Sequence, residues 1–246
     1  MKARYPRDKP KTWADLSSSV HHRWVLPFIW LEHKMDWLAY LLGNWKFLDV
    51  LEYLGSFGVL IAVVFYFAEA GDRLKQKHYQ AWQVINSAQG KGGNGGRIEA
   101  VEELNADGVP LVGVDLSSAF LVGVRLPKAN LARADFDGAD VRGAVIMEAN
   151  LDYSNLRSSN FRGARLKGSS LQHSVLNDSD FTEANLEETN LSGASLEDSD
   201  LLNAELRGVK WENIKSIKNA NIEGVRNAPK GFVEWALQSG AIKKLE

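Results

Sequence analysis

The chain has no cysteine, and only five of its 246 residues are histidine. Without cysteine it can form neither a disulfide nor a thiolate metal site, although this absence does not fix a cellular compartment. The formal net charge is −2, so no general attraction to nucleic acid is implied. The histidines are scattered, and the side chains of the adjacent pair His21 and His22 would diverge on a helix. We therefore expect no enzyme, no metal and no cofactor.

Long apolar runs are scarce as well. The longest run without a charged residue, Tyr53–Ala68, has 16 residues, whereas a membrane-spanning helix needs about 20 predominantly apolar residues. The window 47–67 reaches that length if Asp49 and Glu52 lie near the lipid headgroups or a partner. We predict one transmembrane helix here. A buried helix of a soluble protein, or a helix that enters the bilayer without crossing it, is the alternative.

The segment before this run, 24–54, is rich in tryptophan and leucine, and its apolar residues recur at helical spacing. Because tryptophan and tyrosine concentrate at membrane–water interfaces, the pattern favours a helix in the interface or against another membrane subunit. An ordinary soluble helical core is the alternative. The predicted anchor residues are Trp37, Trp45, Tyr53, Leu54, Phe57, Val59, Leu60, Ile61, Val63, Val64, Phe65 and Phe67.

The flanking charges give a weak signal for topology. Three basic residues follow the apolar run within about 20 residues and two precede it, which places the rest of the chain in the cytoplasm. The basic residues at 2–11 argue for the opposite orientation, and the conflict disappears if the apolar region enters and leaves on one side. The first residues contain no apolar stretch typical of a secretory signal peptide. The expected location is a bacterial inner membrane, crossed once.

A strict period of five residues dominates the second half of the chain. Beginning at Leu111 and ending at Trp211, 21 consecutive positions at this spacing are apolar, and a small or β-branched residue precedes each by two. Neither a helix nor a strand has this period, so it belongs to a higher-order coil. Each unit is expected to form one side of a four-sided coil with its apolar residue inside. Coils stacked at about 4.8 Å would give a rod of about five coils.

Several of these units share a small residue, then Asp or Asn, then Leu or Phe. They are Ala129-Asn130-Leu131, Ala134-Asp135-Phe136, Ala149-Asn150-Leu151 and Ala184-Asn185-Leu186. These units resemble the A-(D/N)-L-x-x repeat of the pentapeptide repeat family. The resemblance covers about 100 residues and implies a mainly β fold, a right-handed quadrilateral β-helix. The apolar and aromatic residues before the repeats predict an α-helical membrane-associated region ahead of it.

The ends of such a coil must be capped, because they expose the apolar interior and unpaired strand edges. A short helix at 97–105 is expected to cap the first coil, and a helix between Pro229 and Gly240 the last. The glycine-rich segment 90–96 lacks the G-K-[ST] of a phosphate loop and is interpreted as a linker. The expected organisation is tail 1–23, anchor 24–70, helix and linker 71–96, N-terminal cap 97–108, β-helix 109–226 and C-terminal cap 227–246.

Surface charge points to interaction rather than catalysis. Residues 168–206 contain no lysine or arginine, whereas basic residues precede them. Arg142 and Arg162 should lie on adjacent coils, where their mutual repulsion would favour a neutralising partner; a solvated face is the alternative. The candidate interaction surface is Arg142, Arg157, Arg162, Arg165, Lys167, Glu183, Glu187, Glu188, Glu197 and Asp198.

These features favour a non-enzymatic, membrane-anchored scaffold or accessory subunit. Its expected partners are the membrane and proteins of an integral membrane complex; nucleic acid is not expected. One alternative is a DNA mimic that inhibits or protects a topoisomerase, which the family resemblance and the acidic coils imply. Another is a regulatory domain of a membrane channel or transporter.

Overall fold

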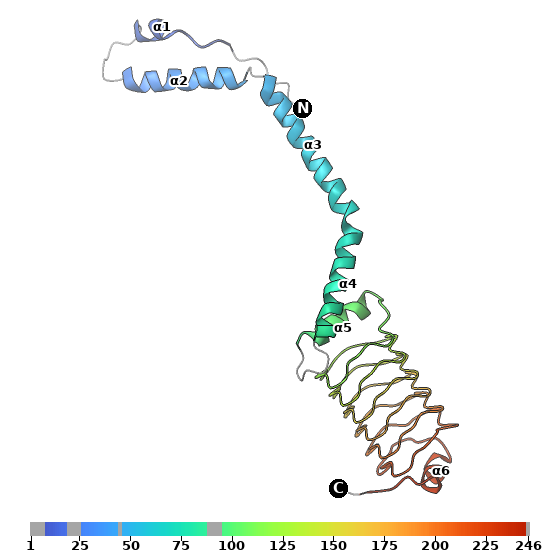
Figure 1. The fold of residues 1–246 in the computed structure, drawn as a ribbon. Helices are drawn as coiled ribbons and strands as arrows, with labels where there is room; N and C mark the ends of the chain where they lie inside the picture. Colours follow the sequence, from blue (N-terminus) through green and yellow to red (C-terminus); the bar gives the residue numbers. More distant parts are fainter. Residues whose placement is uncertain (1–7, 19–25, 44–45, 88–94, 245–246) are drawn as a thin grey trace. The chain divides into compact units, whose positions relative to one another are not determined.

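The computed structural model describes residues 8–18, 26–43, 46–87 and 95–244. The chain divides into two compact units, Met1–Asp72 and Arg73–Glu246. The first unit is helical, and the second is a coil of stacked turns with helices at its ends (Figure 1). The expected linker 90–96 lies mostly outside the described residues.

The first unit contains α1 (Trp13–Ser18), α2 (Leu26–Gly43) and α3 (Lys46–Ala68). The backbone N–H of Asp15 donates to the Thr12 hydroxyl at 3.4 Å, which caps the start of α1. The ring of Trp13 lies 5.9 Å from that of His33, which is buried, and His33 meets Trp37 edge to face. The expected tail 1–23 therefore contains a short helix, and the half-buried aromatic side chain of Trp13 packs against α2.

The helix α3 has 23 residues, and every one of its described side chains is exposed. Within the described residues, no single helix is both long and apolar enough to span a membrane. Tyr53–Ala68 and Ala70–Ser87 reach the required length and composition only when taken together. Trp45, one of the predicted anchor residues, lies outside the described part of the chain.

The second unit is built on a coil that repeats every 20 residues. Parallel bridges join Asp115 to Asp135 and Asp135 to Asn155, and the series continues in this way along the coil. The apolar ladder from Leu111 to Leu206 is buried, with no member more than 2% exposed. Four five-residue units therefore complete one coil, and the predicted β-helix is confirmed.

Each unit ends in a tight turn. In the first, the Val114 N–H donates to the Leu111 carbonyl at 3.2 Å, and Gly113 between them has a φ of 68°. A positive φ at this one turn position is typical of a type II turn. The Asp or Asn of the repeat stabilises the next turn, because its side chain accepts a hydrogen bond from the backbone N–H two residues later. Asp135 does so from Asp137 at 3.0 Å.

The first coil is capped by two helices, α4 (Ala70–Ser87) and α5 (Arg97–Ala106). Ala81 and Ile85 of α4 are buried in the same cluster as the apolar side chains of α5 and the coil. Glu102 of α5 accepts the Arg125 N–H at 2.7 Å, which satisfies a backbone group at the open edge of the coil. The cap is therefore larger than the single predicted helix, because α4 brings its own apolar face to it.

The last coil is capped by α6 (Phe232–Gln238) and the segment after it. After Trp211 the bridge spacing changes from 20 to 21 residues, as in Ser195 to Ser216, because Lys215 is an extra residue. The ring of Trp211 lies 5.8 Å from that of Phe232. Ile242 then exchanges backbone hydrogen bonds of 2.9 and 2.8 Å with Ile222 and Ala220, which covers the final edge.

Candidate interaction surface

The interior of the coil has no room for a ligand. Phe161 and Phe181 stack inside it with ring centroids 5.0 Å apart and planes inclined by 10°. Small hydroxyl side chains complete the filling, and each donates back to the carbonyl three residues earlier, as Ser154 does to Leu151 at 2.6 Å. Among the described residues, no group of three or more His, Cys, Asp and Glu side chains could hold a metal ion. Any binding must therefore use the outer faces.

A polar cleft of about 340 Å³ lies near the C-terminal end, between the last coils and the segment containing Ile242. Its asparagine and aspartate side chains are already paired with one another. Asn219 Nδ2 donates to Asp198 Oδ1 at 3.0 Å, and Asn221 Nδ2 donates to Asp200 Oδ1 at 3.2 Å. The cleft brings together no nucleophile and base in the arrangement that catalysis requires.

The structure places Arg142 and Arg162 on adjacent coils, since the Gly143 N–H donates to the Arg162 carbonyl at 2.9 Å. Arg142 is nevertheless neutralised within the chain, because its Nη2 lies 2.7 Å from Asp140 Oδ2. These hydrogen bonds lower the pKa of Asp140 and raise that of Arg142. A partner is therefore not needed to relieve the expected repulsion between the two arginines.

Ion pairs also connect the basic and acidic parts of the predicted surface. Lys167 Nζ lies 3.2 Å from Glu187 Oε2 and 3.8 Å from Glu188 Oε1, and Arg157 Nη1 lies 3.5 Å from Asp178 Oδ2. Most of these residues are about 20 apart in sequence and so meet on adjacent coils. The predicted separation into basic and acidic regions is therefore bridged at two places.

The remaining acidic residues of the prediction have different environments. Glu197 accepts a hydrogen bond from Asn177 Nδ2 at 3.3 Å, and Asp198 accepts one from Asn219. Glu183 is exposed and has a φ of 59° at its turn. The ten predicted residues thus occupy several faces of the coil rather than one continuous site.

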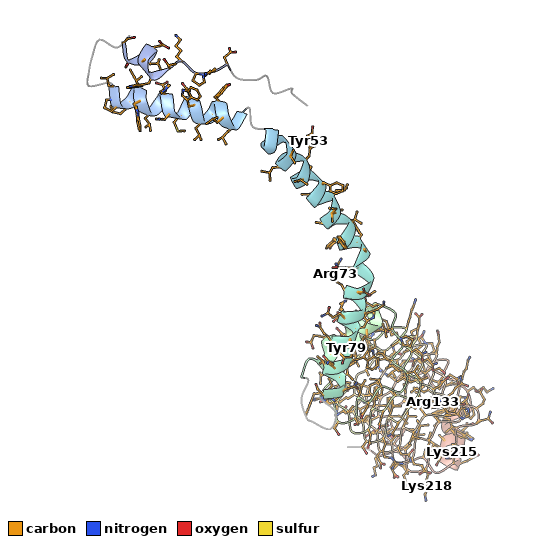
Figure 2. All side chains as sticks on the ribbon, turned by 45° about the horizontal axis from the view of Figure 1, so that its top comes forward. Tyr53, Arg73, Tyr79, Arg133, Lys215 and Lys218 are labelled. Carbon is orange, nitrogen blue, oxygen red and sulfur yellow. The ribbon has the colours of Figure 1, made fainter. Side chains whose placement is uncertain are left out.

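The predicted anchor residues from Tyr53 to Phe67 are exposed on α3, and Figure 2 shows Tyr53 projecting from that helix. Trp37 is different, because its ring packs against His33 and Lys9 Nζ lies 5.8 Å from the ring centroid. Trp37 therefore stabilises the contact between the tail and α2 through aromatic and cation–π interactions.

Sequence reasoning missed three exposed apolar side chains on the first coil, Val112 and two others. Phe120 and Val122 are each 49% exposed. Both occupy outward positions of their units, where most other units carry a polar residue. An apolar residue at an outward position of the five-residue period is a signal that the sequence does contain.

Sequence reasoning also missed a buried arginine in the N-terminal cap. Arg97, the first residue of α5, is fully buried. Burial lowers the pKa of its guanidinium below the usual value, and the negative charge of Asp115 opposes that shift.

The family model for pentapeptide repeats matches residues 111–146, 147–178 and 174–210, with eight copies of the repeat. This match supports the pentapeptide-repeat assignment for the coil. Among curated proteins, no sequence matches the chain.

Solved structures of pentapeptide repeat proteins are also similar. Rfr23 from the cyanobacterium Cyanothece 51142 is 29% identical over 36% of this chain, with a TM-score of 0.28, and the chain spans only 65% of that protein. HetL from Nostoc sp. strain PCC 7120, involved in regulation of heterocyst differentiation, is 22% identical over 55% of this chain and 81% of its own, with a TM-score of 0.20. QnrB1, a plasmid-mediated fluoroquinolone resistance protein, is 17% identical over 56% of this chain and 79% of its own, with a TM-score of 0.25.

Proposed function

We propose that the protein is a non-enzymatic interaction module that is anchored at a membrane and binds partner proteins through the outer faces of its coil. The coil supplies a rigid surface with a filled interior, which suits recognition rather than catalysis. An accessory subunit of an integral membrane complex, including a regulatory domain of a channel or transporter, fits this description.

The observation that carries the anchoring is the exposure of α3. Its apolar side chains are mostly between 40% and 70% exposed, among them Phe57, Val59 and Phe67. Leaving such surface in water costs about 25 cal/mol per Å². The uncharged part of α3, Tyr53–Ala68, would be about 24 Å long at about 1.5 Å per residue, shorter than a hydrocarbon core of about 30 Å. The anchoring therefore rests on the exposed apolar surface of α3 and not on a crossing by this helix alone.

The helix α2 supports the same proposal. Its face opposite the Trp13 contact carries Phe28, Leu31, Met35 and Leu38, all at least 49% exposed. These residues follow one another at spacings of three and four, which places them on one side of a helix. A helix with this exposed stripe would lie in the membrane interface with its apolar side toward the acyl chains.

Sodium carbonate extraction of membranes tests the anchoring. We expect the full chain to stay in the pellet, and the variant Ile61→Arg to be released, because a charge on α3 opposes insertion. Val112→Arg, at an exposed outward position of the coil, is the matched control and should stay with the wild type. Quantitative release of the wild-type chain would overturn the proposed anchoring.

The absence of cysteine makes the topology directly measurable. Single substitutions Lys11→Cys and Glu212→Cys place one thiol in the tail and one on the coil, both at exposed positions. A membrane-impermeant maleimide applied to intact cells and to inverted vesicles then reports the side of each. Labelling on opposite sides indicates a crossing, and labelling on one side indicates entry and exit on the same side. We expect Glu212→Cys to react only in inverted vesicles.

Capture from native membranes in a gentle detergent tests partner binding. We expect specific membrane proteins to copurify with the full chain and to be lost when residues 109–226 are removed. If the same proteins copurify without the coil, the coil does not provide the binding surface.

The acidic stretch 168–206 also suits the alternative of a DNA mimic that acts on a topoisomerase. Its carboxylates are partly neutralised, however, since Glu187 lies within 3.2 Å of Lys167 Nζ and 3.6 Å of Arg207 Nη1. We expect no salt-sensitive inhibition of gyrase supercoiling by the protein. Inhibition of that kind would favour DNA mimicry over the proposed role.

A further inference from the structure

Two columns of outward-facing residues run side by side along the first three coils. In the first column, Val122, Arg142 and Arg162 succeed one another, because the Gly123 N–H donates to the Arg142 carbonyl at 2.8 Å and the Gly143 N–H to the Arg162 carbonyl at 2.9 Å. Backbone pairing therefore fixes these side chains at the spacing of adjacent coils, about 4.8 Å.

The second column follows three residues later on each coil. Parallel bridges join Arg125 to Val145 and Val145 to Arg165. The two columns together bring four exposed arginines to one region of the surface, and we name Arg125, Arg142, Arg162 and Arg165 the arginine patch.

Only one member of the arginine patch has its charge balanced within the described residues. Arg142 pairs with Asp140. For the guanidinium groups of Arg125, Arg162 and Arg165, the described part of the chain offers no carboxylate oxygen within 4 Å, and Arg165 Nη2 contacts Met147 Sδ at 3.6 Å. Three cations on one face thus remain available to an external anion.

Apolar surface adjoins these cations. Val122 begins the first column, and Phe120 lies two residues before it and is bridged to Asp140. Each is 49% exposed. The surface therefore combines charge with an aromatic and an aliphatic side chain at its N-terminal end.

We propose that the arginine patch, together with Phe120 and Val122, binds an acidic segment of a partner protein that also carries apolar side chains. This inference rests on the proposed function and names the chemistry of the partner. The planar guanidinium groups suit carboxylates, which they can bind through two parallel hydrogen bonds. The apolar pair would bury the hydrophobic side chains of the same segment.

The charge beyond the patch favours a short protein segment over nucleic acid. The first column continues to Thr182 and Leu202, and the second to Asn185 and Glu205. Beyond the third coil the next two residues of each column carry no positive charge, and Glu205 is acidic; the second column regains an arginine only at Arg226. A long polyanion would meet this acidic part of the coil and be repelled, whereas a segment spanning the patch alone would not.

Fluorescence anisotropy with a short labelled peptide of alternating glutamate and leucine tests the inference on the full chain in detergent. We expect saturable binding that weakens as salt is raised. The double variant R162E/R165E should weaken it by about tenfold or more, because like charges would then face the peptide. Phe120→Ser should weaken it by a smaller factor, and a peptide of lysine and leucine should not bind.

Arg133→Glu is the control for reversing the charge of one arginine, since Arg133 is exposed and lies outside both columns. It should leave the affinity unchanged within about twofold. The substitutions should preserve the fold, because Glu205 already occupies the column of Arg165; far-UV circular dichroism checks this.

Three results would each overturn the inference. They are an equal loss of peptide affinity with Arg133→Glu, tighter binding of duplex DNA than of the peptide, and no binding of the peptide to the wild-type chain. None of these outcomes bears on carbonate extraction or partner capture, so failure of this inference is distinguishable from failure of the proposed function.

Discussion

The imidazole of His173 lies against Gly193 on the next coil. A Cβ atom added at Gly193 would overlap the imidazole, whose Nδ1 is the nearest atom. On its other side, His173 stacks on Tyr153 with ring centroids 5.0 Å apart and planes inclined by 16°. Gly193 also has a φ of 74°, a conformation in which side chains are strained. The turn therefore favours glycine here without requiring it, since Tyr153 and His173 adopt the same conformation on the preceding coils, and the neighbouring ring adds a second reason for glycine.

Gly193→Ala should destabilise the coil more than an alanine at a turn with open space around it. Gly163→Ala is the control, because Gly163 has a φ of 65° and no atom within 4 Å of an added Cβ. We expect the control to cost about 1 kcal/mol in the free energy of unfolding from backbone strain alone. Gly193→Ala should cost about 1–3 kcal/mol more from overpacking. Urea unfolding followed by circular dichroism measures both.

The double variant H173A/G193A completes the test. Removing the imidazole should abolish the extra cost of Gly193→Ala while leaving the cost of backbone strain. Equal stability of Gly193→Ala and Gly163→Ala would show that the ring moves aside without loss.

A charge inside the coil should unfold it. Leu171 belongs to the apolar ladder and is fully buried. Leu171→Asp would place an unpaired carboxylate among aliphatic side chains, and such a change costs about 4 kcal/mol or more in the free energy of unfolding. Val112→Asp, at an outward position that is 49% exposed, should be tolerated. A normal β-rich spectrum and cooperative unfolding of Leu171→Asp would contradict the assignment of the ladder to the core.

The coil was predictable because its signal is local and repeated. Each five-residue unit carries its own inward Leu or Phe, so Leu116, Leu121 and Leu126 reveal the same period independently. The capping role of α4 was not predictable in this way. Ala81 and Ile85 form an ordinary helical stripe in the sequence, and nothing in that stripe says which surface will cover it.

The surface was less predictable than the interior. Pairs such as Lys167 and Glu187 follow from the 20-residue coil, whereas the pairing of Arg142 with Asp140 depends on the rotamer of a side chain beside its own turn. The turn conformation also has no simple signal, since Tyr153 has a φ of 61°, which the residue type alone disfavours. Neighbouring coils impose that conformation through their backbone hydrogen bonds.

The contact between α4 and α5 should weaken in acid. Lys77 Nζ lies 2.7 Å from Glu103 Oε1 and 3.1 Å from Asp107 Oδ2, and His78 Nε2 lies 2.9 Å from Asp107 Oδ2. Hydrogen bonds from His78 and Lys77 hold the pKa of Asp107 below its usual value. The ionised carboxylate therefore stabilises the folded cap above its unfolded pKa of about 4, and this contribution is lost as the pH falls through the lowered value.

Hydrogen exchange of α4 measures this effect. We expect protection of α4 relative to the coil to be constant above about pH 4 and to decrease below it. Asp107→Asn should reduce the protection of α4 at higher pH and reduce its decrease in acid. Protection of α4 that does not change from neutral pH to well below about pH 4 would show that Asp107 does not hold the cap together.

The choice of fragment boundary should decide whether the coil is stable alone. A cut before residue 97 keeps α5 but removes α4, so Val101 and Leu104 lose contact with Ala81 and Ile85. Losing large buried contacts of this kind costs about 2–5 kcal/mol in the free energy of unfolding. We therefore expect the fragment 73–246 to be soluble, β-rich and cooperative in urea, and the fragment 97–246 to unfold at a lower urea concentration and to bind a hydrophobic dye.

Substituting Ile85→Asp in the longer fragment should reproduce the behaviour of the shorter one, whereas Gln83→Asp, at an exposed position of α4, should not. Equal urea midpoints for the two fragments would mean that α5 alone closes the first coil.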